Sequence, residues 1–161
     1  MKIGIVGAGA IGILFGAYLS ESDHDITFLV RKTSKVHHLY IEKKTENPKQ
    51  ITCDIVSDIT DLKQMDLIII AVKYHHLTHL EDQLNSLPKH IPLLFLQNGL
   101  SHISFLRKLP QETVLIGSVL HGATKVNNST VQHLGIGPTY IGFYKGQWAS
   151  INSLMEGNNE E

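Results

Sequence analysis

An uncharged run from position 3 to position 19 opens the chain, and glycines interrupt it repeatedly. Glycine inside a helix costs about 1 kcal/mol relative to alanine, so a membrane-spanning helix is disfavoured here. The spacing instead predicts a short buried strand over 2–6, a tight turn over 7–12 and a helix over 10–20. A strand, a G-x-G-x-x-G loop and a helix in that order are typical of dinucleotide binding.

Each glycine of this loop has a separate physical task. Gly7 permits the turn, Gly9 lets the backbone approach a pyrophosphate, and Gly12 lets the helix pack closely on the strand. The helix N-terminus then offers unpaired N–H groups to an anion. The candidate cofactor-binding loop consists of Gly7, Ala8, Gly9, Ala10, Ile11 and Gly12. A signal peptide is disfavoured because the apolar run continues beyond the small residues.

Apolar runs alternate with amphipathic stripes along the next hundred residues. Strands are predicted over 25–31, 51–58, 65–73, 91–99 and 112–120, and helices over 74–87 and 101–109. Ser101 is the predicted N-cap of the later helix. The polar stretch 32–50 is predicted to hold one short helical turn, because Pro48 breaks any longer helix. This alternation predicts an α/β fold, a Rossmann-like doubly wound, mostly parallel sheet.

The pattern changes from His121, where short β-prone runs are separated by glycine-rich turns. These runs predict antiparallel edge strands that close the sheet at its C-terminal end. Trp148, Ile151 and Leu154 then predict an amphipathic helix over 147–155 whose apolar face needs a cover.

Composition limits the class of protein. The chain has 161 residues, 42% hydrophobic and 18% charged, with a formal net charge of -1. These values predict a soluble domain with no general affinity for nucleic acid and no membrane partner. The single cysteine, Cys53, excludes an intramolecular disulfide, is interpreted as a packed strand residue, and suits a reducing, cytoplasmic location.

Basic residues cluster after the second predicted strand, and the cluster has two interpretations: a solvated loop or a site for an anionic ligand. The cluster consists of Arg31, Lys32, Lys35, Lys43, Lys44 and Lys49. NAD-binding domains place an acidic residue near the end of this strand, whereas this chain has Arg31 there. Arginine suits a 2′-phosphate, so the sequence favours NADPH over NADH and counts against FAD.

Other candidate side chains follow later strands, because ligands bind beyond the carboxyl ends of parallel strands. Lys73 ends an apolar run and must reach solvent or a ligand, while Asn98 is either a ligand contact or a simple turn former. The pair His75 and His79 lacks a suitable third ligand, so no metal site is predicted. His121 either lines the cleft or is structural.

Six segments, taken in order, resemble the N-terminal domain of ketopantoate reductases, also called 2-dehydropantoate 2-reductases. They are "KIGIVGAGAIGILFGAYL", "FLVR", "DLIIIAVK", "LFLQNGL", "HGATK" and "GIGPTYIGFY". The resemblance covers about residues 1–145 and implies an NADP-binding Rossmann domain. Residues 146–161 would then begin the junction toward a second, helical domain.

The resemblance also implies residue roles and a reaction. Arg31 would hold the 2′-phosphate, Lys73 and Asn98 would face the nicotinamide and substrate, and Ala123 would contact the cofactor. Family members reduce 2-dehydropantoate, a 2-oxo acid, to (R)-pantoate with NADPH, a step toward pantothenate and coenzyme A.

One departure from the family pattern bears on activity. The lysine that acts as general acid and the glutamate that binds substrate belong to the family's helical domain, and Lys125 and Lys145 do not match that lysine's motif. No catalytic residue is therefore assigned, and we expect the chain alone to be inactive. A non-catalytic NADP(H)-sensing or docking module and the cofactor domain of a related dehydrogenase remain alternatives, as do a homodimer and docking onto a separate helical domain.

Overall fold

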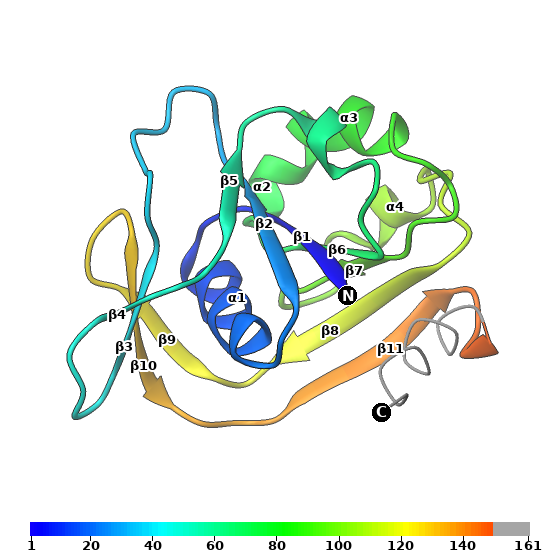
Figure 1. Cartoon of the computed structure of the whole chain (residues 1–161). Coiled ribbons are helices and arrows are strands. Elements are labelled where there is room, and N and C mark those ends of the chain that lie inside the picture. The colour runs from blue at the N-terminus through cyan, green and yellow to red at the C-terminus, as the bar shows by residue number, and fades with distance from the viewer. Residues whose placement is uncertain (150–161) are drawn as a thin grey trace, which may run out of the picture.

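Residues 1–149 are described in this computed structural model, and they build two β-sheets with helices packed around them (Figure 1). The larger, seven-stranded sheet has the strand order β11-β8-β7-β6-β1-β2-β5. Its strands are β1 (Lys2–Val6), β2 (Asp25–Leu29), β5 (Asp54–Val56), β6 (Leu67–Ile70), β7 (Leu93–Phe95), β8 (Val114–Val119) and β11 (Thr139–Lys145).

The central strand of this main sheet is β1, which pairs in parallel with β2 on one side and β6 on the other. From β1 the chain extends outward to β2 and β5, then returns past β1 and continues through β6, β7 and β8. That reversal defines a doubly wound sheet. β11 pairs antiparallel with β8 at the edge, with Tyr140 opposite Ser118. The predicted Rossmann-like α/β fold and its antiparallel C-terminal edge are confirmed.

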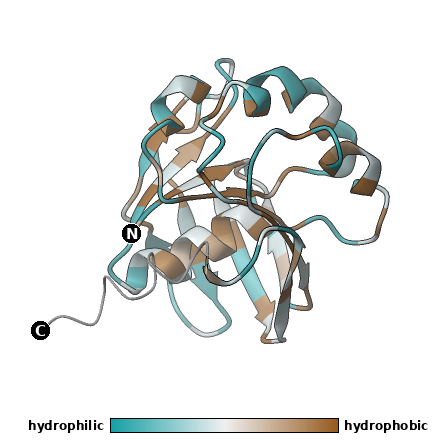
Figure 2. Ribbon diagram, turned by 90° about the vertical axis from the view of Figure 1, so that its right-hand side faces the viewer, coloured by the Kyte–Doolittle hydropathy of each residue, from teal (hydrophilic) through white to brown (hydrophobic). Residues whose placement is uncertain are grey.

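Aliphatic side chains cover both faces of the main sheet. Ile69 belongs to the core cluster on the α1 face, whereas Ile68 and Ile70 belong to the cluster under the remaining helices. A strand buried on both faces needs an uninterrupted apolar run, which is why β6 reads Leu-Ile-Ile-Ile. Figure 2 shows hydrophobic residues concentrated along the central strands and hydrophilic residues along the outer helices and loops.

The helical segments are α1 (Ala10–Glu21), η1 (Ile59–Leu62), α2 (Tyr74–Leu77), η2 (Thr78–Leu80), α3 (Glu81–Asn85) and α4 (Ile103–Leu106). The prediction of one continuous helix over 74–87 is wrong, because a 3-10 turn divides it. β-branched Thr78 and its histidine neighbours are weak helix formers. Leu77, Leu84 and Leu87 are nevertheless buried, so the leucine stripe identified the inward face correctly.

The later helix α4 is shorter than the predicted 101–109, and its N-cap is His102 rather than Ser101. His102 is 2% exposed and stacks on Phe95 of β7. Because a buried imidazole is harder to protonate, burial lowers the pKa of His102.

A second, smaller sheet has the order β4-β3-β10-β9. Its strands are β3 (Tyr40–Lys43), β4 (Lys49–Gln50), β9 (Gly122–Lys125) and β10 (Thr130–Gly135). The helical turn predicted within 32–50 is wrong, because β3 pairs in parallel with the distant β10 and forms a hairpin with β4. The expectation that all strands after His121 close the main sheet holds only for β11, since β9 and β10 belong to the small sheet.

The helix α1 lies between the two sheets. Leu14 belongs to one buried cluster with Phe28 of the main sheet and Ile41 and Val131 of the small sheet. The small sheet therefore shares a core with the main sheet through α1.

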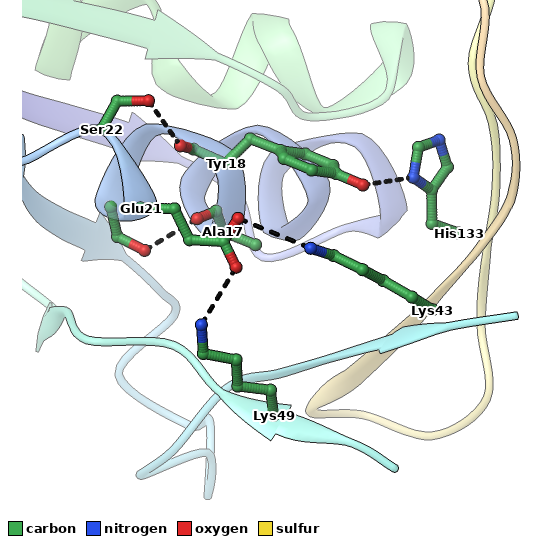
Figure 3. Close-up of polar contacts among 8 residues, drawn as sticks. Ala17, Tyr18, Glu21, Ser22, Lys43, Lys49 and His133 are labelled. Atoms are coloured by element: carbon green, nitrogen blue, oxygen red, sulfur yellow. Dashed lines mark hydrogen bonds and ion pairs between the residues drawn. The ribbon is translucent and has the colours of Figure 1, made fainter. Parts of the chain in front are cut away.

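Polar contacts add to this attachment (Figure 3). The Tyr18 hydroxyl lies 2.7 Å from Nδ1 of His133 on β10, and Glu21 pairs with Lys43 at 3.5 Å and Lys49 at 3.2 Å. Partial burial raises the pKa of Glu21, but the hydrogen bond from Lys49 and the charges of both lysines outweigh it, so that its pKa is lowered. Each contact joins α1 to a different strand or edge of the small sheet.

Cys53 packs against the core as predicted, but it lies just before β5 rather than within a strand. Burial, followed by the negative charge of Asp54, raises the pKa of the Cys53 thiol to about 11. A thiol with so high a pKa stays protonated and unreactive near neutral pH.

The predicted helix over 147–155 lies largely outside the described residues, including Ile151 and Leu154. Trp148 is described: it is 55% exposed and packs edge-on against Phe143 of β11 at 4.8 Å between ring centroids.

Candidate cofactor cleft

The carboxyl ends of β1, β2 and β6 open onto a cleft of about 1740 Å³. The strand order reverses between β1 and β6, and doubly wound sheets bind their ligands at that point. The walls come from the glycine loop after β1, the segment after β2, the region around α2, and the residues around the β9–β10 turn. The small sheet therefore contributes to a cleft that the main sheet creates.

The glycine loop has the geometry expected of its first and third glycines. Gly7 has a φ of +104°, and its N–H donates a hydrogen bond to the Leu29 carbonyl at 3.2 Å, which ties the loop to the end of β2. A Cβ on Gly12 would collide with the carbonyl oxygen of Gly7. The turn and the close helix packing are thus confirmed, while the role of Gly9 at a pyrophosphate stays a prediction.

The N-terminus of α1 is free to receive an anion. Its N-cap is Gly9, no side chain caps it, and its first turn contains no acidic residue. The first N–H groups of a helix have no intrahelical partner, so they suit a phosphate group. Gly7, Ala8 and Gly9 line the cleft, whereas Ala10, Ile11 and Gly12 form the first turn of α1 and are not part of the lining.

The structure divides five of the six residues of the basic cluster into two groups, and the sixth, Lys44, is exposed just after β3. Arg31, Lys32 and Lys35 line the cleft just beyond β2. Lys43 and Lys49 instead pair with Glu21 on the side of α1 that faces the small sheet. The first group fits the interpretation as a site for an anionic ligand, because it lies beside the glycine loop.

Arg31 has a neighbour that the sequence did not suggest. One guanidinium nitrogen, Nη2, lies 3.1 Å from Nδ1 and 3.4 Å from Nε2 of His76. Burial and then the charges of His75 and Arg31 lower the pKa of His76, so the neutral ring is favoured beside the guanidinium. The sequence placed His76 only near the cleft, three residues after Lys73 at the start of the predicted helix, and not beside Arg31.

Lys73 also lines the cleft, although not as the end of a strand. β6 ends at Ile70, and Lys73 is the N-cap of α2, with exposed side chain and extended backbone. The prediction that Lys73 ends a strand is therefore wrong by three positions. The end of β6 could not be located from the sequence, because the apolar run continues through Ala71 and Val72, which are half-buried and line the cleft.

Buried Gln97 fixes the chain between β6 and Lys73. Its Nε2 donates hydrogen bonds to the carbonyls of Ile70 at 3.1 Å and Val72 at 2.8 Å. Gln97 was not among the predicted site residues, although a polar residue near the end of the strand predicted over 91–99 was a usable signal.

Asn98 and Ala123 are not brought to the cleft walls. Asn98 is exposed in the bend after β7, followed by Gly99 with a φ of +83°. Ala123 lies on β9 and packs against the core. Lys125, two residues further along β9, does line the cleft and was not predicted to.

Histidines are frequent in the cleft. They are His37, His38, His75, His76 and His79. Across residues 1–149, no group of three or more histidine, cysteine, aspartate or glutamate side chains is arranged to hold a metal ion. His121 does not line the cleft, and its Nδ1 instead lies 3.2 Å from Nε2 of His133. In the same part of the chain, no helix has the length and apolar character needed to cross a membrane.

The sequence model of the family described as "Ketopantoate reductase PanE/ApbA" matches residues 3–146. The 2-dehydropantoate 2-reductase of Listeria monocytogenes is 33% identical over 153 residues, covering 91% of this chain and 52% of the relative. The Bacillus subtilis enzyme of the same name is 30% identical over 165 residues, covering 100% and 55%. The chain spans about half the length of the curated relatives it matches.

Two solved structures share the fold of this chain over most of its length. The crystal structure of PanE from Bacillus subtilis has a TM-score of 0.85 and 29% identity, covering 97% of this chain and 54% of that one. The ternary structure of D-mandelate dehydrogenase with NADH and anilino(oxo)acetate has a TM-score of 0.82 and 27% identity, covering 97% and 53%. Because the family model matches nearly the whole described chain, the protein belongs to the ketopantoate reductase family.

Proposed function

We propose that residues 1–145 form an NADPH-binding domain and that residues 146–161 begin the junction toward a helical domain. The observation that carries the proposal is the position of Arg31 beside the glycine loop, with Lys32 and Lys35 on the same wall. A guanidinium can bind a phosphate through two parallel hydrogen bonds. Since the 2′-phosphate distinguishes NADPH from NADH, this wall favours NADPH.

The one acidic side chain that lines the cleft within residues 1–149 supports the same choice. Asp58, the N-cap of η1, accepts hydrogen bonds from the Thr60 N–H at 2.9 Å and the Thr60 hydroxyl at 2.8 Å. These bonds, the backbone one first, lower the pKa of Asp58. Both bonds engage Oδ1 alone, and Asp58 follows β5 rather than β2, where NAD-binding domains place the acid that holds the ribose hydroxyls.

The remaining residues are assigned to successive parts of the cofactor, from the pyrophosphate to the nicotinamide. The pyrophosphate is assigned to the glycine loop and the first turn of α1, where N–H groups and the helix dipole favour negative charge. Lys73, Asn98 and Ala123 are assigned to the nicotinamide and substrate end. Lys73 has the support of its place in the cleft, whereas Asn98 and Ala123 rest on family membership alone.

The proposed reaction is the reduction of a 2-oxo acid, 2-dehydropantoate, to (R)-pantoate, in the cytoplasm and on the route to pantothenate and coenzyme A. NADPH, when bound, supplies the hydride. Family resemblance places the catalytic lysine and the substrate-binding glutamate in a helical domain rather than in the matched residues 3–146. This chain's own residues therefore bind and orient the cofactor, and the proton donor is expected from a helical domain.

An exposed apolar surface offers a place for that domain. Leu120, Leu134 and Ile136 are 59%, 54% and 90% exposed, where the chain crosses between the two sheets. The relatives are about twice as long as the part that matches, which supports a helical domain as the occupant. Sedimentation velocity tests the other occupant, a second copy: a dimer that Ile136→Ser dissolves would replace the helical domain in this proposal.

D-mandelate dehydrogenase supports an alternative within the same class. It shares this fold at a TM-score of 0.82, and its solved structure contains NADH and anilino(oxo)acetate. A non-catalytic NADP(H)-sensing module, which would need only the cofactor cleft, is a second alternative.

Turnover by residues 1–161 separates these functions. We expect the chain to bind NADPH but to oxidise it with 2-dehydropantoate at least about 10²–10⁴-fold below a complete reductase, because a missing general acid has that effect. Loss of nicotinamide absorbance reports the reaction, with mandelate-type 2-oxo acids as the comparison substrates. Turnover at roughly 1–10³ per second would mean that a catalytic acid lies within these residues.

A further inference from the structure

Lys125 joins the small sheet to the glycine loop. It is the last residue of β9, and its Nζ donates a hydrogen bond to the Ala8 carbonyl at 3.0 Å. The side chain lines the cleft beside that loop. Lys125, from the small sheet, thus places its ammonium group beside the glycine loop that follows β1 of the main sheet.

The Lys125 ammonium has N–H groups that the Ala8 carbonyl does not use. An ammonium carries three N–H groups, and the Ala8 carbonyl takes one of them. None of the ion pairs formed among residues 1–149 involves Lys125. Partial burial lowers its pKa, which means that the ammonium has lost some of its water without gaining a carboxylate. An anion bound in the cleft would accept hydrogen bonds from the remaining N–H groups and would supply the missing negative charge.

Either the pyrophosphate or the 2′-phosphate of NADPH could contact the Lys125 ammonium, and the structure favours the pyrophosphate. The Ala8 carbonyl belongs to the loop that leads into the N-terminus of α1, whereas Arg31, Lys32 and Lys35 lie on the separate wall after β2. We propose that Lys125 binds the pyrophosphate of the nicotinamide cofactor, so that the small sheet forms part of the cofactor site. This inference rests on the proposed cofactor-binding function.

Lys125→Met removes the charge and keeps the length of the side chain. Because NADH and NADPH share the pyrophosphate, both dissociation constants should rise by the same factor, about tenfold, as a charge-assisted hydrogen bond is lost. Lys125→Arg should restore most of the affinity. In Lys125→Met, the affinity should also depend less on salt, because one cation–phosphate contact is gone.

Lys145→Met is the matched control, because Lys145 Nζ also donates to a backbone carbonyl, that of Leu109, at 2.9 Å, but lies outside the cleft. It should leave both dissociation constants unchanged in calorimetric titrations. A loss confined to NADPH would overturn the proposal by placing Lys125 at the 2′-phosphate. Unchanged binding of both cofactors by Lys125→Met would overturn it while leaving the proposed function intact, whereas a wild type that binds neither cofactor would overturn both.

Discussion

The two sheets pack on the same helix but differ in how they are built. The main sheet contacts α1 through close apolar and backbone packing, with Gly12 against the carbonyl of Gly7. The small sheet adds polar contacts of long side chains: His133, Lys43 and Lys49 contact Tyr18 and Glu21 of α1, and Lys125 binds the Ala8 carbonyl just before α1. The main sheet therefore fixes the position of the cleft, and the small sheet brings side chains to it.

The largest expected effect follows from breaking the main-sheet packing. Gly12→Ala places a Cβ against the Gly7 carbonyl oxygen, a backbone atom that cannot move aside cheaply. Overpacking of this kind should lower the free energy of unfolding by about 1–3 kcal/mol. Urea unfolding measures it. Gly142→Ala is the control, because its Cβ meets nothing within 4 Å, and equal effects of the two changes would contradict the account.

A smaller effect is expected where the small sheet is attached. Tyr18→Phe removes the 2.7 Å hydrogen bond to His133 and should cost about 0.5–1.5 kcal/mol in the free energy of unfolding. Tyr140→Phe serves as a control, because Tyr140 is 64% exposed. If Tyr18→Phe lowered the free energy of unfolding more than Gly12→Ala, the main-sheet packing would not be the larger contribution to stability.

The smallest expected effect is a change in pH dependence on the α4 side of the main sheet. Burial lowers the pKa of His102, and neither ring nitrogen has a hydrogen-bond partner among the described residues. The unfolded chain therefore binds the proton more readily. The stability that depends on His102 being neutral is fully present above the ordinary histidine pKa of about 6.5 and is lost as the pH falls below that value.

Chemical unfolding of wild type and His102→Phe between neutral and mildly acidic pH measures this effect. The variant keeps an aromatic ring against Phe95 and should lose less stability on acidification. Exposed His90 offers a control, His90→Gln, which should retain the wild-type slope. Identical slopes for wild type and His102→Phe would show that His102 does not contribute.

The same contrast explains what could be predicted from the sequence. The glycine loop, α1 and the main strands follow from neighbouring residues, so periodicity and glycine spacing located them. The pairing of β3 with β10 joins positions far apart in the chain, such as Ile41 and Val131, and no local pattern encodes it. The 3-10 turn that divides 74–87 depends on tertiary packing, which can override a correct leucine stripe.

The candidate site shows the same division. Gly7, Arg31 and Lys73 could be identified because they follow strands of the main sheet, and the structure places all three at the cleft. Lys125 reaches the cleft from the small sheet, and its contact with Ala8 could not be foreseen without that sheet's position. Asn98 follows β7, one strand away from the reversal point, which is why its place after a strand did not bring it to the cleft walls.

Calorimetric titration of NADPH and NADH into wild type and Arg31→Ala tests the central claim most directly. Arg31 should add a charge-assisted contact to the 2′-phosphate alone, so the wild type should bind NADPH more tightly than NADH. Loss of a hydrogen bond to a charged group should weaken NADPH by roughly 10- to 150-fold in Arg31→Ala and leave NADH nearly unchanged. Equal affinities of the wild type for both cofactors, or equal losses in the variant, would contradict the account.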